Sequence, residues 1–124
     1  MTMNILVVDD FATMRKMIRA ALRGLAGATI TEADSAFLAW TLLQKNHYDL
    51  LLTDWVMPEM SGLELVQRVR ARPALAQMRI LMISSEGQSE KQEIARKLGV
   101  DGFLPKPFSA RALNEEIRRL FGIA

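Results

Sequence analysis

Short apolar runs recur along the chain, and longer segments with amphipathic spacing separate them. The apolar runs are rich in Val, Ile and Leu and are bounded by polar residues, as in strands buried on both faces of a parallel sheet. We therefore expect five strands, which lie near residues 5–8, 28–32, 50–53, 80–83 and 102–104.

Helical spacing fills the intervals between these runs. From Met14 to Leu25, apolar side chains recur three or four positions apart with basic residues between them, which predicts an amphipathic helix. Further helices are predicted over residues 35–45, 61–72, 89–99 and 109–121. Ser61 with Glu64 matches a capping box, and Ser109 opens the last helix. Strands that alternate with helices through short loops predict an α/β fold with a parallel sheet and helices on both faces.

Composition narrows the functional classes. The chain has 124 residues, half of them hydrophobic, which fits one compact domain over residues 1–124. The formal net charge of +2 is too small to indicate a nucleic-acid partner. The absence of cysteine excludes disulfides, thiolate nucleophiles and cysteine-based zinc sites. The sequence shows neither a signal peptide nor an apolar stretch long enough for a bilayer, so we expect a cytoplasmic protein without a membrane partner.

Polar side chains follow four of the predicted strands. Asp9 and Asp10 follow the first strand, Asp54 the third, Ser84 the fourth and Lys106 the fifth. Because ligands of open α/β sheets bind beyond the carboxyl ends of the strands, we expect these side chains to converge at one edge. In the alternative interpretation each acid only caps a helix, and the Asp9-Asp10 pair does stand where the first helix needs a cap.

Three carboxylates at one site repel one another, so their convergence calls for a cation. Two unit charges roughly 4 Å apart cost about 4 kcal/mol at an effective dielectric of ~20. Zinc is disfavoured because His47 is the only histidine and cysteine is absent. Magnesium suits oxygen ligands and commonly accompanies a phosphate. Since an aspartate can accept a phosphoryl group as an acyl phosphate, with Lys106 and Ser84 contacting its oxygens, the pattern indicates phosphoryl transfer.

Four motifs, in this order, resemble those of the response-regulator receiver family, closest to its chemotaxis members. They are VVDDF at residues 7–11, DWVMP at 54–58, SGLEL at 61–65 and KPF at 106–108. The resemblance extends over nearly the whole chain. It implies a doubly wound, flavodoxin-like fold with five parallel strands in the order 2-1-3-4-5 and five helices. The bond between Lys106 and its following proline is a candidate for the cis form.

The resemblance also implies roles for the acidic residues. Asp54 would accept a phosphoryl group from a partner histidine kinase. Asp9, Asp10, Asp54 and the backbone carbonyl of Val56 would hold Mg²⁺. From its position in the sequence, and not from the resemblance, we expect Trp55 to lie exposed in a loop beside the site, as a fluorescent reporter of Mg²⁺ binding. The protein would then be a signalling switch rather than an enzyme, although it would assist its own phosphorylation and dephosphorylation.

The output side of such a switch is implied by the same resemblance. Lys106 would contact the phosphoryl group, Ser84 would move toward it, and Phe103 would turn inward as an aromatic switch. The face of the fourth helix, fifth strand and fifth helix would bind a protein target, with the flagellar motor switch as one candidate. A monomer is expected. Phe103 stands where a tyrosine is usual, and Glu116 stands where chemotaxis members carry a cation, so the target stays open.

Other functions fit parts of the pattern. A phosphate-relay intermediate would return its phosphoryl group to a histidine-containing partner, and an adaptor could regulate a kinase outside chemotaxis. A phosphatase of the haloacid-dehalogenase type would share the fold, the aspartate and Mg²⁺. That class needs a second acid two residues after its nucleophile, and position 56 is Val.

Overall fold

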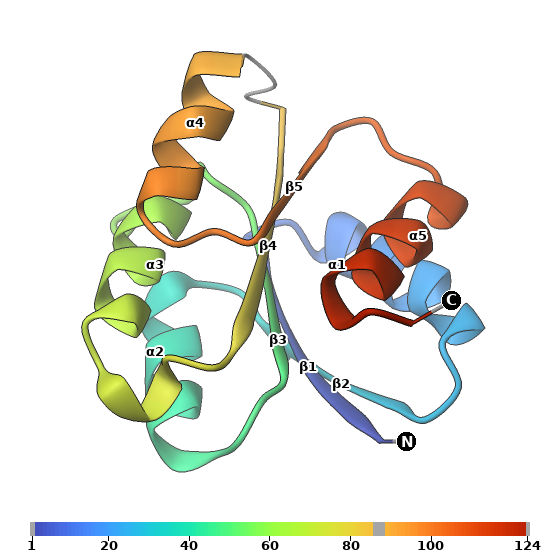
Figure 1. Cartoon of the computed structure of the whole chain (residues 1–124), viewed down its shortest axis with the longest axis horizontal. Helices are drawn as coiled ribbons and strands as arrows, with labels where there is room; N and C mark the ends of the chain where they lie inside the picture. Colours follow the sequence, from blue (N-terminus) through green and yellow to red (C-terminus); the bar gives the residue numbers. More distant parts are fainter. Residues whose placement is uncertain (1, 86–88, 124) are drawn as a thin grey trace.

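Five parallel strands form the centre of the molecule, and helices cover both faces of the sheet (Figure 1). The computed structural model describes residues 2–85 and 89–123. The strands are β1 (Met3–Val8), β2 (Ala28–Ala33), β3 (Leu50–Thr53), β4 (Arg79–Ser84) and β5 (Gly102–Pro105). The helices are α1 (Ala12–Ala21), α2 (Ala36–Lys45), α3 (Gly62–Arg70), α4 (Ser89–Lys97) and α5 (Ala110–Phe121).

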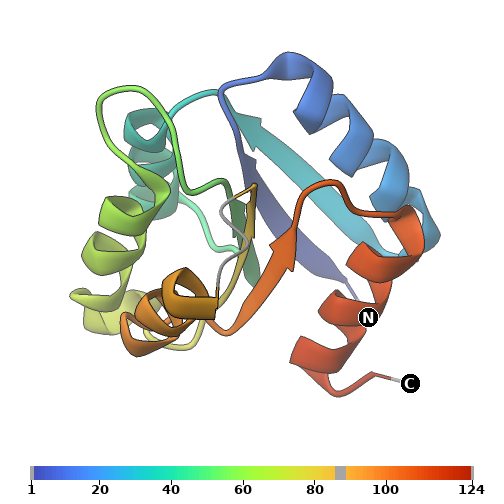
Figure 2. The same cartoon turned by 90° about the horizontal axis from the view of Figure 1, so that it is seen from above.

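The strand order is β2-β1-β3-β4-β5, and every adjacent pair is parallel. Helices α1 and α5 cover one face of the sheet, and α2, α3 and α4 cover the other (Figures 1 and 2). The doubly wound fold that the resemblance implied is therefore confirmed. Strands β2 and β5 form the two edges, which explains why Pro105 is tolerated at the end of β5.

Both faces of the sheet are packed, and this explains why the strands are continuously apolar. Along β1, Leu6 and Val8 belong to the hydrophobic cluster beneath α2, α3 and α4. Ile5 and Val7 belong to the cluster beneath α1 and α5. None of these four side chains is more than 1% exposed. Such burial on both sides holds β1 rigidly between two hydrophobic layers.

Serine side chains begin helices α3 and α5 as predicted, and Ser35 does the same for α2. In each case the hydroxyl oxygen accepts the backbone N–H of the residue three positions later, at 3.0–3.1 Å. Three helices end earlier than predicted, and α4 is one of them, since it ends at Lys97 rather than at residue 99. Helix α1 ends at Ala21 and gives way to a 3₁₀ turn at Leu22–Gly24, before Gly27 with a φ of 81°. Helix α3 ends at Arg70, before a second 3₁₀ turn at Pro73–Leu75.

Among the described residues, no helix combines the length and the apolarity that a membrane span requires.

Candidate functional site

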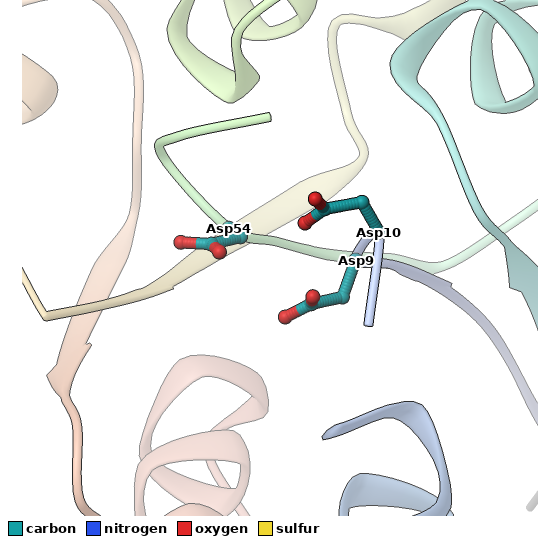
Figure 3. A group of neighbouring side chains, drawn as sticks. All are labelled: Asp9, Asp10 and Asp54. Carbon is teal, nitrogen blue, oxygen red and sulfur yellow. The ribbon is translucent and has the colours of Figure 1, made fainter. Parts of the chain in front are cut away.

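The carboxyl ends of β1 and β3 lie side by side and bring three aspartates together (Figure 3). Val8 pairs with Thr53 in the register of these strands, so the residues that follow, Asp9 and Asp54, are neighbours. The backbone N–H of Asp54 donates to the carbonyl of Val8 at 3.2 Å. One carboxylate oxygen from each of Asp9, Asp10 and Asp54 lies within 4.8 Å of the others. The predicted convergence of these acids at one edge of the sheet is thus observed.

Lys106, directly after the edge strand β5, contacts two of these carboxylates. Its Nζ atom lies 3.1 Å from Oδ2 of Asp54 and 3.3 Å from Oδ2 of Asp9. The side chain of Lys106 is 17% exposed, so its charge acts in a partly desolvated setting where ion pairing is stronger than in water. The backbone N–H of Lys106 donates to the carbonyl of Ser84 at 2.9 Å, and the bond from Lys106 to Pro107 is cis, as the sequence suggested.

The Asp54 carboxylate is held in place but not sealed from solvent. Its Oδ2 atom accepts from Lys106, and its Oδ1 atom accepts the backbone N–H of Trp55 at 2.7 Å. The hydroxyl of Thr53 donates to the backbone carbonyl of Asp54 at 3.0 Å. The side chain of Asp54 remains 10% exposed. An oriented carboxylate that a small phosphodonor can still reach is suited to nucleophilic attack.

Asp9 is the most deeply buried of the three acids, with a side chain only 2% exposed. Burial raises the pKa of Asp9 above its usual value of 3.8. A hydrogen bond from the backbone N–H of Phe11, at 2.9 Å, and the ammonium group of Lys106 partly oppose that rise, and the negative charge of Asp54 adds to it. Because burial makes the negative charge of the Asp9 carboxylate unfavourable, a cation bound beside it would offset that cost.

Asp10 carries the clearest sign of a missing partner. Its Oδ1 atom is buried and has no hydrogen-bond partner among the described residues. A buried carboxylate oxygen left in this way costs about 1–3 kcal/mol or more, and such atoms in native proteins usually meet a ligand, an ion or water. Together with the oxygens of Asp9 and Asp54, it offers the all-oxygen donor set that Mg²⁺ prefers. The residues therefore fit a hard divalent cation.

The interpretation of Asp9 and Asp10 as simple helix caps does not hold. Helix α1 has Phe11 at its N-cap position, and no side chain makes a capping hydrogen bond there. Asp9 instead receives its hydrogen bond from Phe11, one residue before the helix begins. Both acids thus face the site rather than the first turn of α1.

The remaining predicted residues lie at different distances from this centre. Ser84 is fully buried at the end of β4, and its backbone is tied to that of Lys106. Phe103 lies in β5, half-buried against the cluster beneath α2, α3 and α4, so it belongs to the α4–β5 side rather than to the acidic site. Val56 is 59% exposed, and the role of its backbone carbonyl at the site stays a prediction.

Trp55 differs from its predicted exposed position. It is half-buried and packs against the same hydrophobic cluster as Phe103. The ammonium group of Lys91, on α4, lies 5.7 Å from the centre of the indole ring. This cation–π contact connects the segment after Asp54 to α4.

Sequence reasoning missed two residues that support the aspartates. Gly62 belongs to a recognised motif, but nothing in the sequence shows that a β-carbon there would overlap the backbone carbonyl oxygen of Asp54. Arg15 reads as one of several cations on an amphipathic helix, yet its Nη1 atom donates to the backbone carbonyl of Asp9 at 2.7 Å. Neither contact has a local sequence signal, because each depends on how separate elements pack.

Known proteins resemble this chain in sequence and in fold. The sequence model of the response regulator receiver domain matches residues 5–118. The chain is 40% identical to chemotaxis protein CheY of Pseudomonas aeruginosa over 119 residues, which are 96% of each protein. It is 42% identical to the chemotaxis protein CheY homolog of Campylobacter jejuni, over 97% of this chain and 93% of that protein. The solved structure of the chemotaxis response regulator CheY4 of Vibrio cholerae matches with a TM-score of 0.90 at 31% identity, covering 97% of this chain and 99% of that one.

The close approach of α3 to Asp54 makes Gly62 sensitive to a single added carbon. We expect Gly62→Ala to lower the free energy of unfolding by about 1–3 kcal/mol, because the new methyl group must displace the backbone of Asp54. Urea unfolding measures the change. Gly24→Ala is the matched control, since the nearest atom to its β-carbon is the movable amide of Asn114, at 3.2 Å. Equal stability of Gly62→Ala and the unaltered protein would contradict the close approach.

The raised pKa of Asp9 predicts a pH-dependent effect of its removal. Folded Asp9 binds a proton more tightly than unfolded Asp9, so its contribution to stability is lost as the pH rises from 3.8 through the raised pKa. In EDTA, Asp9→Asn should therefore be more stable than the unaltered protein at pH 7, and the difference should shrink toward pH 4. Urea unfolding across this range tests it, with exposed Asp34→Asn as a control for charge loss. A difference independent of pH would contradict the assignment.

Proposed function

This chain belongs to the response regulator receiver family, and on that premise we propose that it is a phosphorylation switch whose acceptor is Asp54. Residues 1–124 form the single receiver domain of this proposal. The observation that carries it is the ion pair of Lys106 with Asp54, which is 3.1 Å long and only partly exposed to solvent, beside the carboxylates of Asp9 and Asp10. A receiver with these groups is a signalling switch, and it assists its own phosphorylation and dephosphorylation rather than turning over a substrate.

Each side chain of the site has a part in accepting the phosphoryl group. The hydrogen bond from the Trp55 N–H fixes one oxygen of Asp54 and leaves the other facing Lys106. As the phosphorus–oxygen bond to Asp54 forms and the donor leaves, Lys106 changes from a carboxylate partner to a phosphoryl partner. The hydroxyl of Ser84 contributes a hydrogen bond to a phosphoryl oxygen.

Mg²⁺ is the proposed cofactor. Asp9, Asp10, Asp54 and the backbone carbonyl of Val56 would hold it, and its charge would offset that of the transferring group. The unpartnered oxygen of Asp10 and the cluster of three acids support this assignment. Lys106 supplies one positive charge, which does not balance three carboxylates, so a divalent cation would complete the neutralisation.

Phosphorylation would be transmitted to the face of α4, β5 and α5. It adds a charge of about −1.5 to −2 and three acceptor oxygens, toward which Ser84 and Lys106 are drawn. The space vacated beside β4 would let Phe103 turn inward from β5. Driving such an equilibrium from 1:99 to 99:1 takes about 5.5 kcal/mol of differential interaction, which a doubly charged group in a metal site can supply.

The proposed partners are a histidine kinase as phosphodonor and a protein target that docks on that face. Relatives named as chemotaxis proteins, at 40% and 42% identity, favour a role in chemotaxis or motility, with the flagellar motor switch as the leading target. Glu116 on α5 forms an ion pair with Arg119 at 2.7 Å, and the arginine is the more exposed partner, with a side chain 61% exposed against 18% for Glu116. We place the protein in the cytoplasm as a monomer, without nucleic-acid or membrane partners.

A second role remains compatible with this site. As a phosphate-relay intermediate or a kinase-regulating adaptor outside chemotaxis, the protein would use the same chemistry at Asp54 and differ only in the partner. Pull-down with protein treated with beryllofluoride, a mimic of the phosphoryl group, compared with untreated protein, separates these roles. Enrichment of a histidine-containing phosphotransfer protein rather than a motor component would favour the relay.

Loss of the acceptor carboxylate should abolish phosphorylation. We expect the unaltered protein to gain the mass of one phosphoryl group when incubated with acetyl phosphate and Mg²⁺, and to lose that mass in hydroxylamine, which cleaves acyl phosphates. Asp54→Asn should gain none, and Asp34→Asn, at an exposed position after β2, should react like the unaltered protein. EDTA should prevent the reaction. Hydroxylamine-sensitive labelling of Asp54→Asn would place the acceptor elsewhere.

Removal of the Asp10 carboxylate should weaken Mg²⁺ binding. In a Trp40→Phe background, Trp55 is the single tryptophan, and its fluorescence follows a Mg²⁺ titration. We expect Asp10→Ala to raise the dissociation constant for Mg²⁺ about tenfold or more, because an anionic ligand is lost. Isothermal titration calorimetry checks the value independently of fluorescence. An unchanged dissociation constant would argue against a metal at Asp10.

A further inference from the structure

Asp9 is held at its backbone as well as at its side chain. Its N–H donates to the carbonyl of Ala33 on β2 at 3.2 Å, and its carbonyl accepts from Nη1 of Arg15 at 2.7 Å. That carbonyl belongs to the peptide group that joins Asp9 to Asp10. The guanidinium of Arg15 therefore restrains the short link between two of the three acids of the site.

Arg15 is itself restrained by a carboxylate on a different element. Its Nε atom lies 3.0 Å from Oε1 of Glu32 on β2, and Nε of Arg19 lies 2.8 Å from Oε2 of the same residue. The pKa of Glu32 is lowered by its hydrogen bond with Arg19 and by that with Arg15, so Glu32 is ionised at neutral pH. Helix α1 and strand β2 are thus joined by one acid and two bases.

The two arginines of this network differ in what else they contact. Arg15 has a side chain only 16% exposed and reaches the backbone of Asp9. Arg19 has a side chain 44% exposed and donates to the carbonyl of Ile30, away from the acidic site. Loss of either removes one positive charge and one ion pair to Glu32. Only loss of Arg15 releases the peptide group between the two acids.

We propose that Arg15 is a positioning residue for the divalent cation: it holds the peptide group between Asp9 and Asp10, and Glu32 holds Arg15. This inference rests on the proposed function, because it concerns the same Mg²⁺ site. Supporting groups around metal ligands set ligand orientation, and their loss typically costs 10- to 100-fold in metal affinity. Loss of Arg15 should lower Mg²⁺ affinity by an amount near the lower end of this range, since the ligands themselves remain.

The test compares Mg²⁺ affinity in matched variants, all carrying Trp40→Phe and titrated by Trp55 fluorescence and by calorimetry. We expect Arg15→Gln to raise the dissociation constant for Mg²⁺ about tenfold, and Arg15→Lys to recover part of that loss because an ammonium can still donate to the Asp9 carbonyl. Arg19→Gln, which removes the same charge and an ion pair to the same acid, should stay within about twofold of the Trp40→Phe parent.

The variant Glu32→Gln tests independently whether the support of Arg15 by Glu32 affects Mg²⁺ binding. It should weaken Mg²⁺ binding less than Arg15→Gln, and the double variant should bind no more weakly than Arg15→Gln alone, because Glu32 acts through Arg15. Thermal melting of every variant is measured in EDTA. A merely structural role for the network would lower the melting temperature of both arginine variants and leave Mg²⁺ affinity unchanged in both.

The outcomes separate this inference from the function on which it rests. The inference is overturned if Arg15→Gln binds Mg²⁺ as tightly as the parent, or if Arg19→Gln loses as much Mg²⁺ affinity as Arg15→Gln does. In either case, Mg²⁺ binding by the parent still supports the metal site. Absence of Mg²⁺ binding by the parent overturns both. If Arg15→Gln does not fold, Glu32→Gln and Arg15→Lys decide: weaker binding in Glu32→Gln than in Arg19→Gln supports the inference, and equal binding overturns it.

Discussion

The mutual repulsion of three carboxylates at one edge of the sheet is the constraint on which the rest of the site depends. Asp9, Asp10 and Asp54 place oxygens within 4.8 Å of one another, and two of these acids are nearly buried. At such separations in a partly desolvated setting, the repulsion amounts to several kcal/mol per pair, by order of magnitude. Lys106 offsets part of it through two contacts. The remaining repulsion is unfavourable energy that binding of a cation can offset.

Rigid surroundings make this arrangement possible. The backbone on either side of the acids is fixed by the paired ends of β1 and β3, and those strands are held between two hydrophobic clusters. Gly62 lets α3 approach the carbonyl of Asp54 so closely that any added β-carbon would displace that backbone, and Arg15 ties α1 to the carbonyl of Asp9. Trp55 and Lys91 form a contact between the segment after Asp54 and α4.

Much of this organisation could be predicted from the sequence, and the exceptions share a cause. Periodicity gave the strands and helices to within a few residues, and the motifs around Asp9, Asp54 and Lys106 pointed to the strand order and to the acids that meet. The early end of α1 was missed because helical spacing continues through Leu22 into a 3₁₀ turn. The half-burial of Trp55 and the reach of Arg15 were missed because both depend on the packing of elements far apart in sequence. The switch roles of Ser84 and Phe103 and the metal-binding role of the Val56 backbone carbonyl stay predictions, since they concern states other than the one described.

Pro105, at the end of the edge strand β5, limits how another protein chain can pair with that edge of the sheet. The N–H of Lys106 points inward, to the carbonyl of Ser84 on β4, so the alternation of a strand directs the amide position of residue 105 outward. Proline has no hydrogen to offer there. An extended peptide that tried to continue the sheet beyond β5 would lose a main-chain hydrogen bond at that point, and so would a second copy of the chain. Strand addition is thereby discouraged, and recognition at this edge is left to side chains, where specificity can be encoded.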